Sequence, residues 1–191
     1  MSKNSVTRFP PVRWSILILT QPKRARLFDR IRGLLLPQLA PYENRVELLS
    51  RLFNVNQSLG ENRQALVDAA WGEYVSFIDD DDTVARDYVE RIFPLLDGVD
   101  YVGFRLQLYV NGVRQKPTFH SLQYAAWRDD DKGFYRDLSH LNPIRRDLAL
   151  LVPFEGGRGE DFAWAERLRA TGRVKTEHFI PEVMYHYWFR S

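Results

Sequence analysis

The stretch Gly72-Glu73-Tyr74-Val75-Ser76-Phe77-Ile78-Asp79-Asp80-Asp81-Asp82 decides the fold. Its apolar run, residues 74–78, is typical of a buried strand in a parallel sheet, and it ends directly in four carboxylates. Ligands of open α/β folds bind beyond the carboxyl ends of such strands. Because four adjacent like charges repel one another, we interpret residues 79–82 as a site for a divalent cation, which takes oxygen ligands. The alternative is an acidic turn in which Asp82 caps a following helix.

The composition describes a globular chain of ordinary domain size. The chain has 191 residues, of which 45% are hydrophobic and 14% aromatic, so one domain with a sizeable core is expected. It contains no cysteine, which excludes disulfides, thiolate zinc sites and cysteine nucleophiles. The apolar segment at residues 14–19 is too short to cross a bilayer. We therefore predict a cytoplasmic protein with no membrane partner.

The charge is unevenly placed along the chain. Residues 1–63 carry eleven Lys or Arg against four Asp or Glu, a surplus of +7, although the whole chain is only +2. Such asymmetry is typical of a surface that faces a polyanion, and equally of solvated helix faces.

Strands and helices alternate in the first half of the chain. The patterns predict strands at residues 14–20, 46–52 and 74–78, with a helical alternative for the second, and helices at 22–37, 59–70 and 84–96. Ser58 and Glu61 form a capping-box pattern before the second helix. This order predicts an α/β fold with a mainly parallel, Rossmann-like sheet flanked by helices.

The second half begins with a hairpin. Residues 101–110 and 113–118 read as strands around the turn Asn111-Gly112. A helix at 160–171 follows a glycine-rich loop, and residues 179–189 form an aromatic strand. We expect a loosely ordered arm, residues 1–13, and one domain, residues 14–191. Residues 14–100 would be its nucleotide-sugar half, and residues 101–191 its acceptor-binding and catalytic half.

Three motifs, taken in their order along the chain, are more specific than any one of them alone. They are Asp79–Asp82 after a strand, Gly159-Glu160-Asp161 at the start of a helix, and Tyr185-His186-Tyr187 in a late strand. Together with Gly60, Arg63, Ala70 and Gly72 upstream, they resemble glycosyltransferase family 2, of the GT-A fold, over residues 14–189. Gln64 stands where that family usually has Asn.

The resemblance implies a metal-dependent, inverting glycosyltransferase that uses a nucleotide-diphosphate sugar, with a UDP-sugar favoured. In the metal site it implies Asp81, Asp79 and His186 as ligands of Mn²⁺ or Mg²⁺. At the donor it implies Thr20, Arg63, Asp79 and Asp80, and in catalysis Asp161 as the base with Glu160 beside it. Each residue also has an ordinary interpretation: Glu160 and Asp161 as acidic residues of a first helical turn, His186 as a core histidine, and Arg63 as cover for a helix face.

The chemistry of sugar transfer needs these residue types. A divalent cation stabilises the negative charge that develops on a leaving diphosphate, and an Arg can assist it. An acceptor hydroxyl becomes a good nucleophile when a positioned carboxylate removes its proton. One such base, with no nucleophile on the enzyme, predicts inversion at the anomeric carbon.

The acceptor side is expected in residues 101–153, which are rich in aromatic and basic side chains. Aromatic rings stack on sugars and on nucleobases alike. One candidate acceptor is a hydroxymethylated base in DNA, which some virus-encoded members of the family modify, and the other is a hydroxyl of a glycan or protein.

Two other function classes fit less well. A sugar nucleotidyltransferase would carry glycine in the loop after the first strand, which here reads Thr20-Gln21-Pro22-Lys23-Arg24. A non-catalytic sugar- or polyanion-binding module would have lost Asp81 or Asp161, and both are present.

Overall fold

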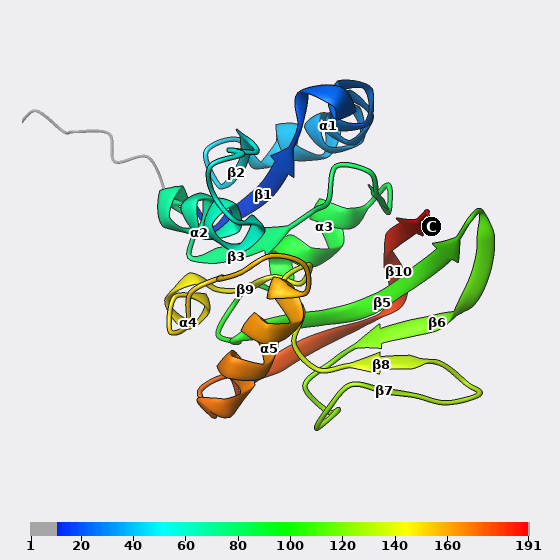
Figure 1. The fold of residues 1–191 in the computed structure, drawn as a ribbon. Coiled ribbons are helices and arrows are strands. Elements are labelled where there is room, and N and C mark those ends of the chain that lie inside the picture. The colour runs from blue at the N-terminus through cyan, green and yellow to red at the C-terminus, as the bar shows by residue number, and fades with distance from the viewer. Residues whose placement is uncertain (1–10, 191) are drawn as a thin grey trace, which may run out of the picture.

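A mixed sheet with helices on both faces forms the body of the molecule (Figure 1). The fold is known from a computed structural model, which describes residues 11–190. The predicted arm, residues 1–13, therefore lies mostly outside the described residues. Its last residue is held firmly, because the Arg13 guanidinium pairs with Glu73 at 2.9 Å and with Asp97 at 3.0 Å.

The sheet has ten strands within the described residues: β1 (Trp14–Thr20), β2 (Val46–Leu52), β3 (Tyr74–Phe77), β4 (Thr83–Val84), β5 (Tyr101–Val110), β6 (Val113–His120), β7 (Arg128–Asp129), β8 (Phe134–Arg136), β9 (Ile144–Arg145) and β10 (Glu177–Phe189). The α-helices are α1 (Ala25–Leu39), α2 (Leu59–Ala69), α3 (Tyr88–Ile92), α4 (Arg146–Ala149) and α5 (Glu160–Ala170). Short 3₁₀ turns occupy Pro22–Arg24, Ala40–Tyr42 and Phe93–Leu95. No helix in this part of the chain is both long and apolar enough to cross a membrane.

The strand order is β2-β1-β3-β9-β5-β6-β8-β7. In addition, β10 pairs with β5 on the edge opposite β6, and β4 pairs with β10. β1 pairs in parallel with β2 and β3, and β10 pairs in parallel with β5. β5 and β6 form the predicted antiparallel hairpin. The predicted α/β class, with a parallel sheet in the first half of the chain, is confirmed.

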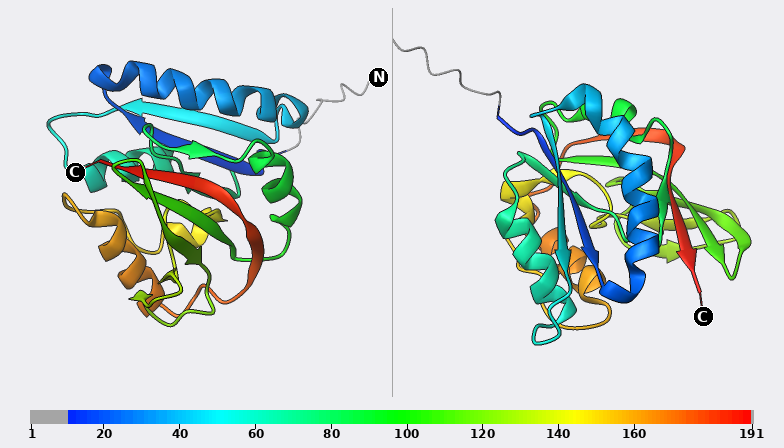
Figure 2. Two further views of the ribbon diagram at one scale, coloured as in Figure 1. Left: turned by 90° about the vertical axis from the view of Figure 1, so that its right-hand side faces the viewer. Right: turned by 90° about the horizontal axis from the view of Figure 1, so that it is seen from above.

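The central strand β1 is buried on both faces, which explains why its sequence does not alternate between apolar and polar residues. Ile16 and Ile18 face a core that contains Ile31 and Leu35 of α1 together with α3. Leu17 faces the opposite core, formed by α2, α4 and α5. Figure 2 shows α1 on one side of the sheet and α2 and α5 on the other.

Two predicted helix boundaries are wrong. Pro37 does not end the first helix, which continues to Leu39, because a proline so near the end removes only one of the last hydrogen bonds. The predicted helix at 84–96 begins only at Tyr88. Thr83 and Val84 form β4 instead, since the edge of β10 offers them hydrogen-bond partners.

The capping box that begins α2 is confirmed. The Glu61 N–H donates to the Ser58 hydroxyl at 3.2 Å, and the Ser58 N–H donates to the Glu61 carboxylate at 2.6 Å. Beside it, the Gly60 N–H donates to the carbonyl of Gly156 at 2.8 Å. The first turn of α2 therefore lies directly on the loop that precedes α5.

This close approach explains why residue 60 is a glycine. A Cβ at Gly60 would lie 2.5 Å from the backbone of Glu155. We expect Gly60→Ala to lower the free energy of unfolding by about 1–3 kcal/mol, as overpacking does. The matched control is Gly33→Ala in α1, where nothing lies within 4 Å, and it should raise stability by about 0.5–1 kcal/mol. Urea unfolding measures both, and equal effects of the two substitutions would contradict the packing described.

Candidate active site

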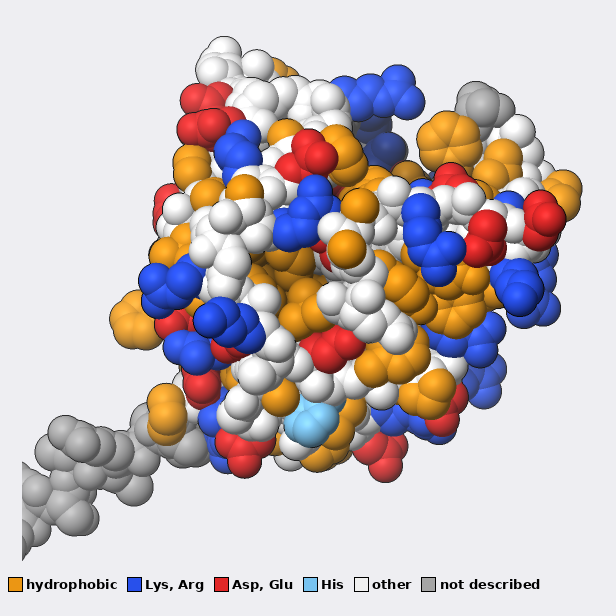
Figure 3. Space-filling view, turned by 90° about the horizontal axis from the view of Figure 1, so that it is seen from below, with side chains coloured by type: hydrophobic (Ala, Val, Ile, Leu, Met, Phe, Trp, Pro, Cys, Tyr) orange, Lys and Arg blue, Asp and Glu red, His pale blue; other side chains and the backbone are white. Residues whose placement is uncertain are grey.

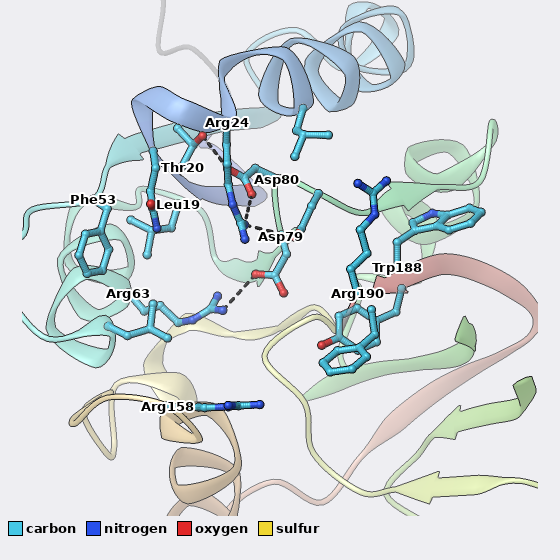
Figure 4. Close-up of a pocket in the computed structure, with 16 residues that line it drawn as sticks. Leu19, Thr20, Arg24, Phe53, Arg63, Asp79, Asp80, Arg158, Trp188 and Arg190 are labelled. Carbon is cyan, nitrogen blue, oxygen red and sulfur yellow. Dashed lines mark hydrogen bonds and ion pairs between the residues drawn. The ribbon is translucent and has the colours of Figure 1, made fainter. Parts of the chain in front are cut away.

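A cavity of about 600 Å³ opens at the carboxyl ends of β1 and β3 (Figure 4). Open α/β sheets bind ligands at this edge. Its polar lining includes Thr20, Arg24, Arg63, Asp79, Asp80 and Asp81. Five of the eight site residues predicted from the sequence, all except Glu160, Asp161 and His186, thus line one cavity.

Asp80 anchors the acidic loop, residues 79–82, to the end of β1. Its carboxylate is 1% exposed and accepts hydrogen bonds from the Thr20 hydroxyl and the Arg24 guanidinium, both at 2.7 Å. The side chains of Thr20 and Asp80, both predicted to contact the donor, are therefore directed at each other.

The other two carboxylates of the cavity have fewer partners. Burial alone would raise the pKa of Asp79, but the Arg63 guanidinium, 3.0 Å away, holds it below its usual value. The pKa of Asp81 is raised, first by burial and then by the charge of Asp79, although Arg24 lies 3.3 Å away and opposes the shift. A bound cation would therefore stabilise the charged form of Asp81 more than that of Asp79.

Asp82 ties the acidic loop to β10 and does not cap a helix. Its buried carboxylate accepts hydrogen bonds from the Tyr185 hydroxyl at 2.8 Å and from the Trp188 N–H at 2.7 Å. Burial and the charge of Asp79 raise its pKa to about 8. Tyr185 also accepts a hydrogen bond from the Asp79 N–H, so the end of β10 fixes the backbone of the loop.

Arg63 joins the acidic loop to the first turn of α5. Its Nη2 donates to Asp79 at 3.0 Å, and its Nε donates to Glu160 at 2.8 Å. The guanidinium lies 4.9 Å from the ring centre of Phe77, and its Nη1 is buried without a hydrogen-bond partner in the described structure. Burial raises the pKa of Glu160 even though Arg63 opposes the shift. The carboxylate of Glu160 is therefore held in its ion pair with Arg63.

Asp161, next along α5, lies against a histidine that sequence reasoning did not single out. Its Oδ2 is 3.6 Å from Nδ1 of His140. Burial, followed by the charge of Arg63, lowers the pKa of His140 to about 4, so the imidazole is neutral near pH 7. The only sequence signal for His140 was its place in the aromatic, basic segment.

The backbone of His186 pairs with Thr83, directly after the acidic loop, but its side chain points away from that loop. Successive residues of a strand point to opposite faces, so His186 faces away from Tyr185 and Tyr187. Its ring lies 6.1 Å from that of Tyr109. Within residues 11–190, no group of three or more His, Asp or Glu side chains is arranged to hold a metal ion.

Asp79 and Asp81 alone still suit one kind of metal site. Mg²⁺ in nucleotide enzymes is bound by one or two carboxylates, with water and substrate phosphates as the other ligands. Both side chains line the cavity and are partly exposed, Asp79 by 28% and Asp81 by 34%, so an ion can reach their carboxylates. These two residues therefore fit an ion that a diphosphate helps to hold.

Two further arginines line the cavity, Arg158 from the loop before α5 and Arg190 after β10 (Figure 4). Sequence reasoning missed both, because only the fold brings these segments to the end of β3. Guanidinium groups bind phosphate oxygens in pairs of parallel hydrogen bonds.

Part of the positive charge of residues 1–63 is used in ion pairs and hydrogen bonds within the molecule. Arg24 and Arg63 pair with the acidic loop, and Arg30 donates to the carbonyl oxygen of Asp81 at 2.6 Å. On the face seen in Figure 3, Lys and Arg side chains are interspersed with Asp and Glu. The charge asymmetry therefore does not by itself identify a polyanion surface.

Loss of Arg63 should be strongly destabilising. Arg63→Leu would leave the carboxylates of Asp79 and Glu160 without their cation, and breaking such a buried pair costs about 3–5 kcal/mol. Arg91→Leu is the control: Arg91 pairs with Asp87 and Glu182 at the surface, where ion pairs contribute little. Chemical unfolding of both variants measures the difference. A small loss of stability in Arg63→Leu would mean that the ion pairs of Arg63 with Asp79 and Glu160 do not stabilise the folded state.

Comparison with known proteins gives a family and a fold. The family model described as glycosyl transferase family 2 matches residues 36–152, more than half of the chain. The crystal structure of Staphylococcus aureus TarS 1–349 superposes with a TM-score of 0.64 at 14% identity, covering 93% of this chain and 60% of that one.

The complex of TarS 1–349 with UDP-GlcNAc gives a TM-score of 0.65 at 14% identity, with 94% and 59% covered. The complex with UDP gives 0.64 at 13% identity, with 93% and 61% covered. This chain thus spans about three-fifths of the TarS 1–349 chains. No curated protein matches the sequence. The predicted GT-A type α/β fold is confirmed.

Proposed function

Because the chain belongs to glycosyl transferase family 2, we propose that its cavity binds a nucleotide-diphosphate sugar and that the protein transfers the sugar to an acceptor hydroxyl. One observation carries the proposal. Arg63 joins Asp79, which lines the cavity, to the first turn of α5, where Asp161 lies. A donor site and a base are thus fixed relative to each other.

We infer that the donor is a UDP-sugar. The crystal structure of TarS with UDP-GlcNAc supports this choice, since TarS shares the fold. The cavity of about 600 Å³ has the size of a nucleotide site. Arg158 and Arg190, which line the cavity, can donate to phosphate oxygens.

Asp81 and Asp79 would hold Mn²⁺ or Mg²⁺ beside the diphosphate. When bound, the ion supplies Lewis-acid stabilisation of the negative charge on the leaving diphosphate. Arg24, 3.3 Å from Asp81, keeps that carboxylate in place at the cavity wall.

Asp161 is the base in this proposal, and Glu160 is a positioning residue. Glu160 is 4% exposed and bound to Arg63, whereas the Asp161 side chain is 35% exposed. The amino end of α5 favours a charged carboxylate at its first turn. Asp161 takes the proton of the acceptor hydroxyl as the oxygen attacks the anomeric carbon. Direct attack with no enzyme nucleophile inverts that carbon.

For the acceptor, we propose a hydroxymethylated base in DNA, with a glycan or protein hydroxyl as the alternative. An aromatic-walled cavity beside the donor site suits the ring of either acceptor, so the choice depends on experiment. The salt dependence of the acceptor KM tests it. Contacts with DNA phosphates should make the KM rise steeply with salt, because counterions are released on binding. A salt-independent KM, with transfer to a glycan or peptide, would favour the alternative.

A further inference from the structure

The imidazole of His140 lies between the end of β3 and the first turn of α5. The His140 carbonyl accepts a hydrogen bond from the N–H of Phe77, the last residue of β3, at 2.8 Å, and the centres of the two rings are 5.8 Å apart. On the other side, Nδ1 of His140 is 3.6 Å from Oδ2 of Asp161. The His140 side chain is only 6% exposed, so packing holds its ring beside Asp161.

The surroundings of His140 determine which ring nitrogen carries the proton. The imidazole is neutral near pH 7, because burial and then the charge of Arg63 lower its pKa to about 4. A neutral imidazole has one N–H and one bare nitrogen, and an ionised carboxylate only accepts hydrogen bonds. The nitrogen that faces Asp161 must therefore be the donor, so Nδ1 carries the proton. Nε2, which is buried and has no hydrogen-bond partner within residues 11–190, is the bare nitrogen.

Asp161 depends on this contact for its orientation. Arg63 is engaged by Asp79 and Glu160, so in the described part of the chain His140 is the basic side chain nearest to the Asp161 carboxylate. The Asp161 side chain is 35% exposed, and packing alone does not fix it. A general base works only when one of its oxygens lies within hydrogen-bond reach of the proton that it takes.

A neutral donor suits this task better than a cation does. A positive charge beside a carboxylate stabilises the ionised form and makes the carboxylate a weaker base. A neutral N–H orients the carboxylate with a smaller loss of basicity. The distance of 3.6 Å is slightly longer than a hydrogen bond, and contacts between catalytic groups commonly tighten when substrate binds, so a small movement completes the hydrogen bond.

We propose that His140 is a positioning residue for sugar transfer: its Nδ1–H holds Oδ2 of Asp161 and leaves Oδ1 to take the proton of the acceptor hydroxyl. The proposal rests on the proposed function, in which Asp161 is the base. As the acceptor oxygen bonds to the anomeric carbon, its proton passes to Oδ1 of Asp161 and the bond to the diphosphate breaks. His140 keeps its own proton throughout.

The tautomer of His140 is tested without any substrate. Two-bond ¹H–¹⁵N correlation spectra of the intact protein, labelled with ¹⁵N-histidine, distinguish a protonated ring nitrogen from a bare one. The His140 signals are those that disappear in His140→Asn. At pH 7 they should show a protonated Nδ1 and a bare Nε2.

Two substitutions separate the donor nitrogen from the rest of the ring. The amide nitrogen of Asn is attached at Cγ and takes the place of Nδ1, whereas that of Gln lies one bond further and takes the place of Nε2. The assay is release of UDP from UDP-GlcNAc or UDP-glucose with Mn²⁺, in which water replaces the acceptor. His140→Gln should lower kcat about 10- to 100-fold, the effect of losing a hydrogen bond to a charged group, and His140→Asn should stay within about threefold of wild type. UDP affinity should match wild type in both variants, because His140 does not line the donor cavity.

A double substitution distinguishes positioning from a general disturbance of the fold. In the Asp161→Asn background there is no base to orient, so adding His140→Gln should change kcat by less than about twofold. A merely structural role would instead multiply the two losses. His178→Gln is the control, because His178 is exposed on β10 and lines neither the donor cavity nor the cavity beside it, and it should retain the wild-type kcat.

Three results would overturn the proposal. They are a proton on Nε2 of His140 in place of Nδ1, a kcat in His140→Gln that is no lower than in His140→Asn, and multiplied losses in the double variant. Failure of the wild-type protein to bind UDP or to release it from a UDP-sugar is a separate result. It contradicts the proposed function, while the spectra still report the tautomer of His140.

Discussion

Asp161→Asn is expected to bind the donor as wild type does and to transfer sugar about 10²–10⁴-fold more slowly, the usual contribution of a general base. The amide keeps the shape of the carboxylate but cannot take the acceptor proton. Asp161 does not line the donor cavity, so UDP affinity should be preserved. The measurement is kcat for transfer, with UDP affinity determined on the same samples.

Glu166→Gln provides the control for Asp161→Asn. Glu166 lies on the same helix, is half-exposed and lines neither cavity, so its substitution should leave kcat unchanged. If Asp161→Asn retained more than a tenth of the wild-type kcat, another group would have to take the proton. His140, 3.6 Å away, would then be the first residue to examine.

Asp81→Asn is expected to abolish metal-dependent donor binding. Metal stabilisation of the leaving group is worth several kcal/mol, which corresponds to roughly a 10²–10³-fold loss in kcat/KM. The amide also removes a carboxylate that burial has left short of positive partners, so the variant should be at least as stable as wild type. Transfer rates with varied Mn²⁺, together with thermal unfolding, measure both effects.

Asp97→Asn serves as the control, because the Asp97 side chain is 90% exposed, pairs with Arg13 at the amino end of β1 and does not line the cavity at the carboxyl end of that strand. It should retain wild-type kcat/KM. Normal activity in Asp81→Asn that also resisted EDTA would show that the arginines alone hold the diphosphate, and that transfer needs no divalent cation at Asp79 and Asp81.

Local patterns predicted most of the framework. β1, β2, the capping box of α2, the β5–β6 hairpin and α5 each depend on residues close together in the sequence. The acidic loop at the end of β3 was placed correctly for the same reason, since a short apolar run followed by carboxylates is a signal within one segment.

Features that depend on contacts between distant segments were not predictable. β4 forms only because β10 lies beside it, and Asp82 accepts hydrogen bonds from residues more than a hundred positions away. His140 reaches Asp161 through the fold, and the face on which His186 points follows from the register of β10. A sequence pattern contains no information on these pairings.

The central claim is that the cavity at the ends of β1 and β3 binds a nucleoside diphosphate together with a divalent cation. Calorimetric titration of UDP into the wild-type protein, with Mn²⁺ and then with EDTA, tests it most directly. We expect saturable binding with Mn²⁺ that weakens strongly in EDTA and is lost in Asp81→Asn. No binding of UDP or GDP under either condition would contradict it, and residues 79–82 would then be an acidic turn held by Arg24 and Arg63.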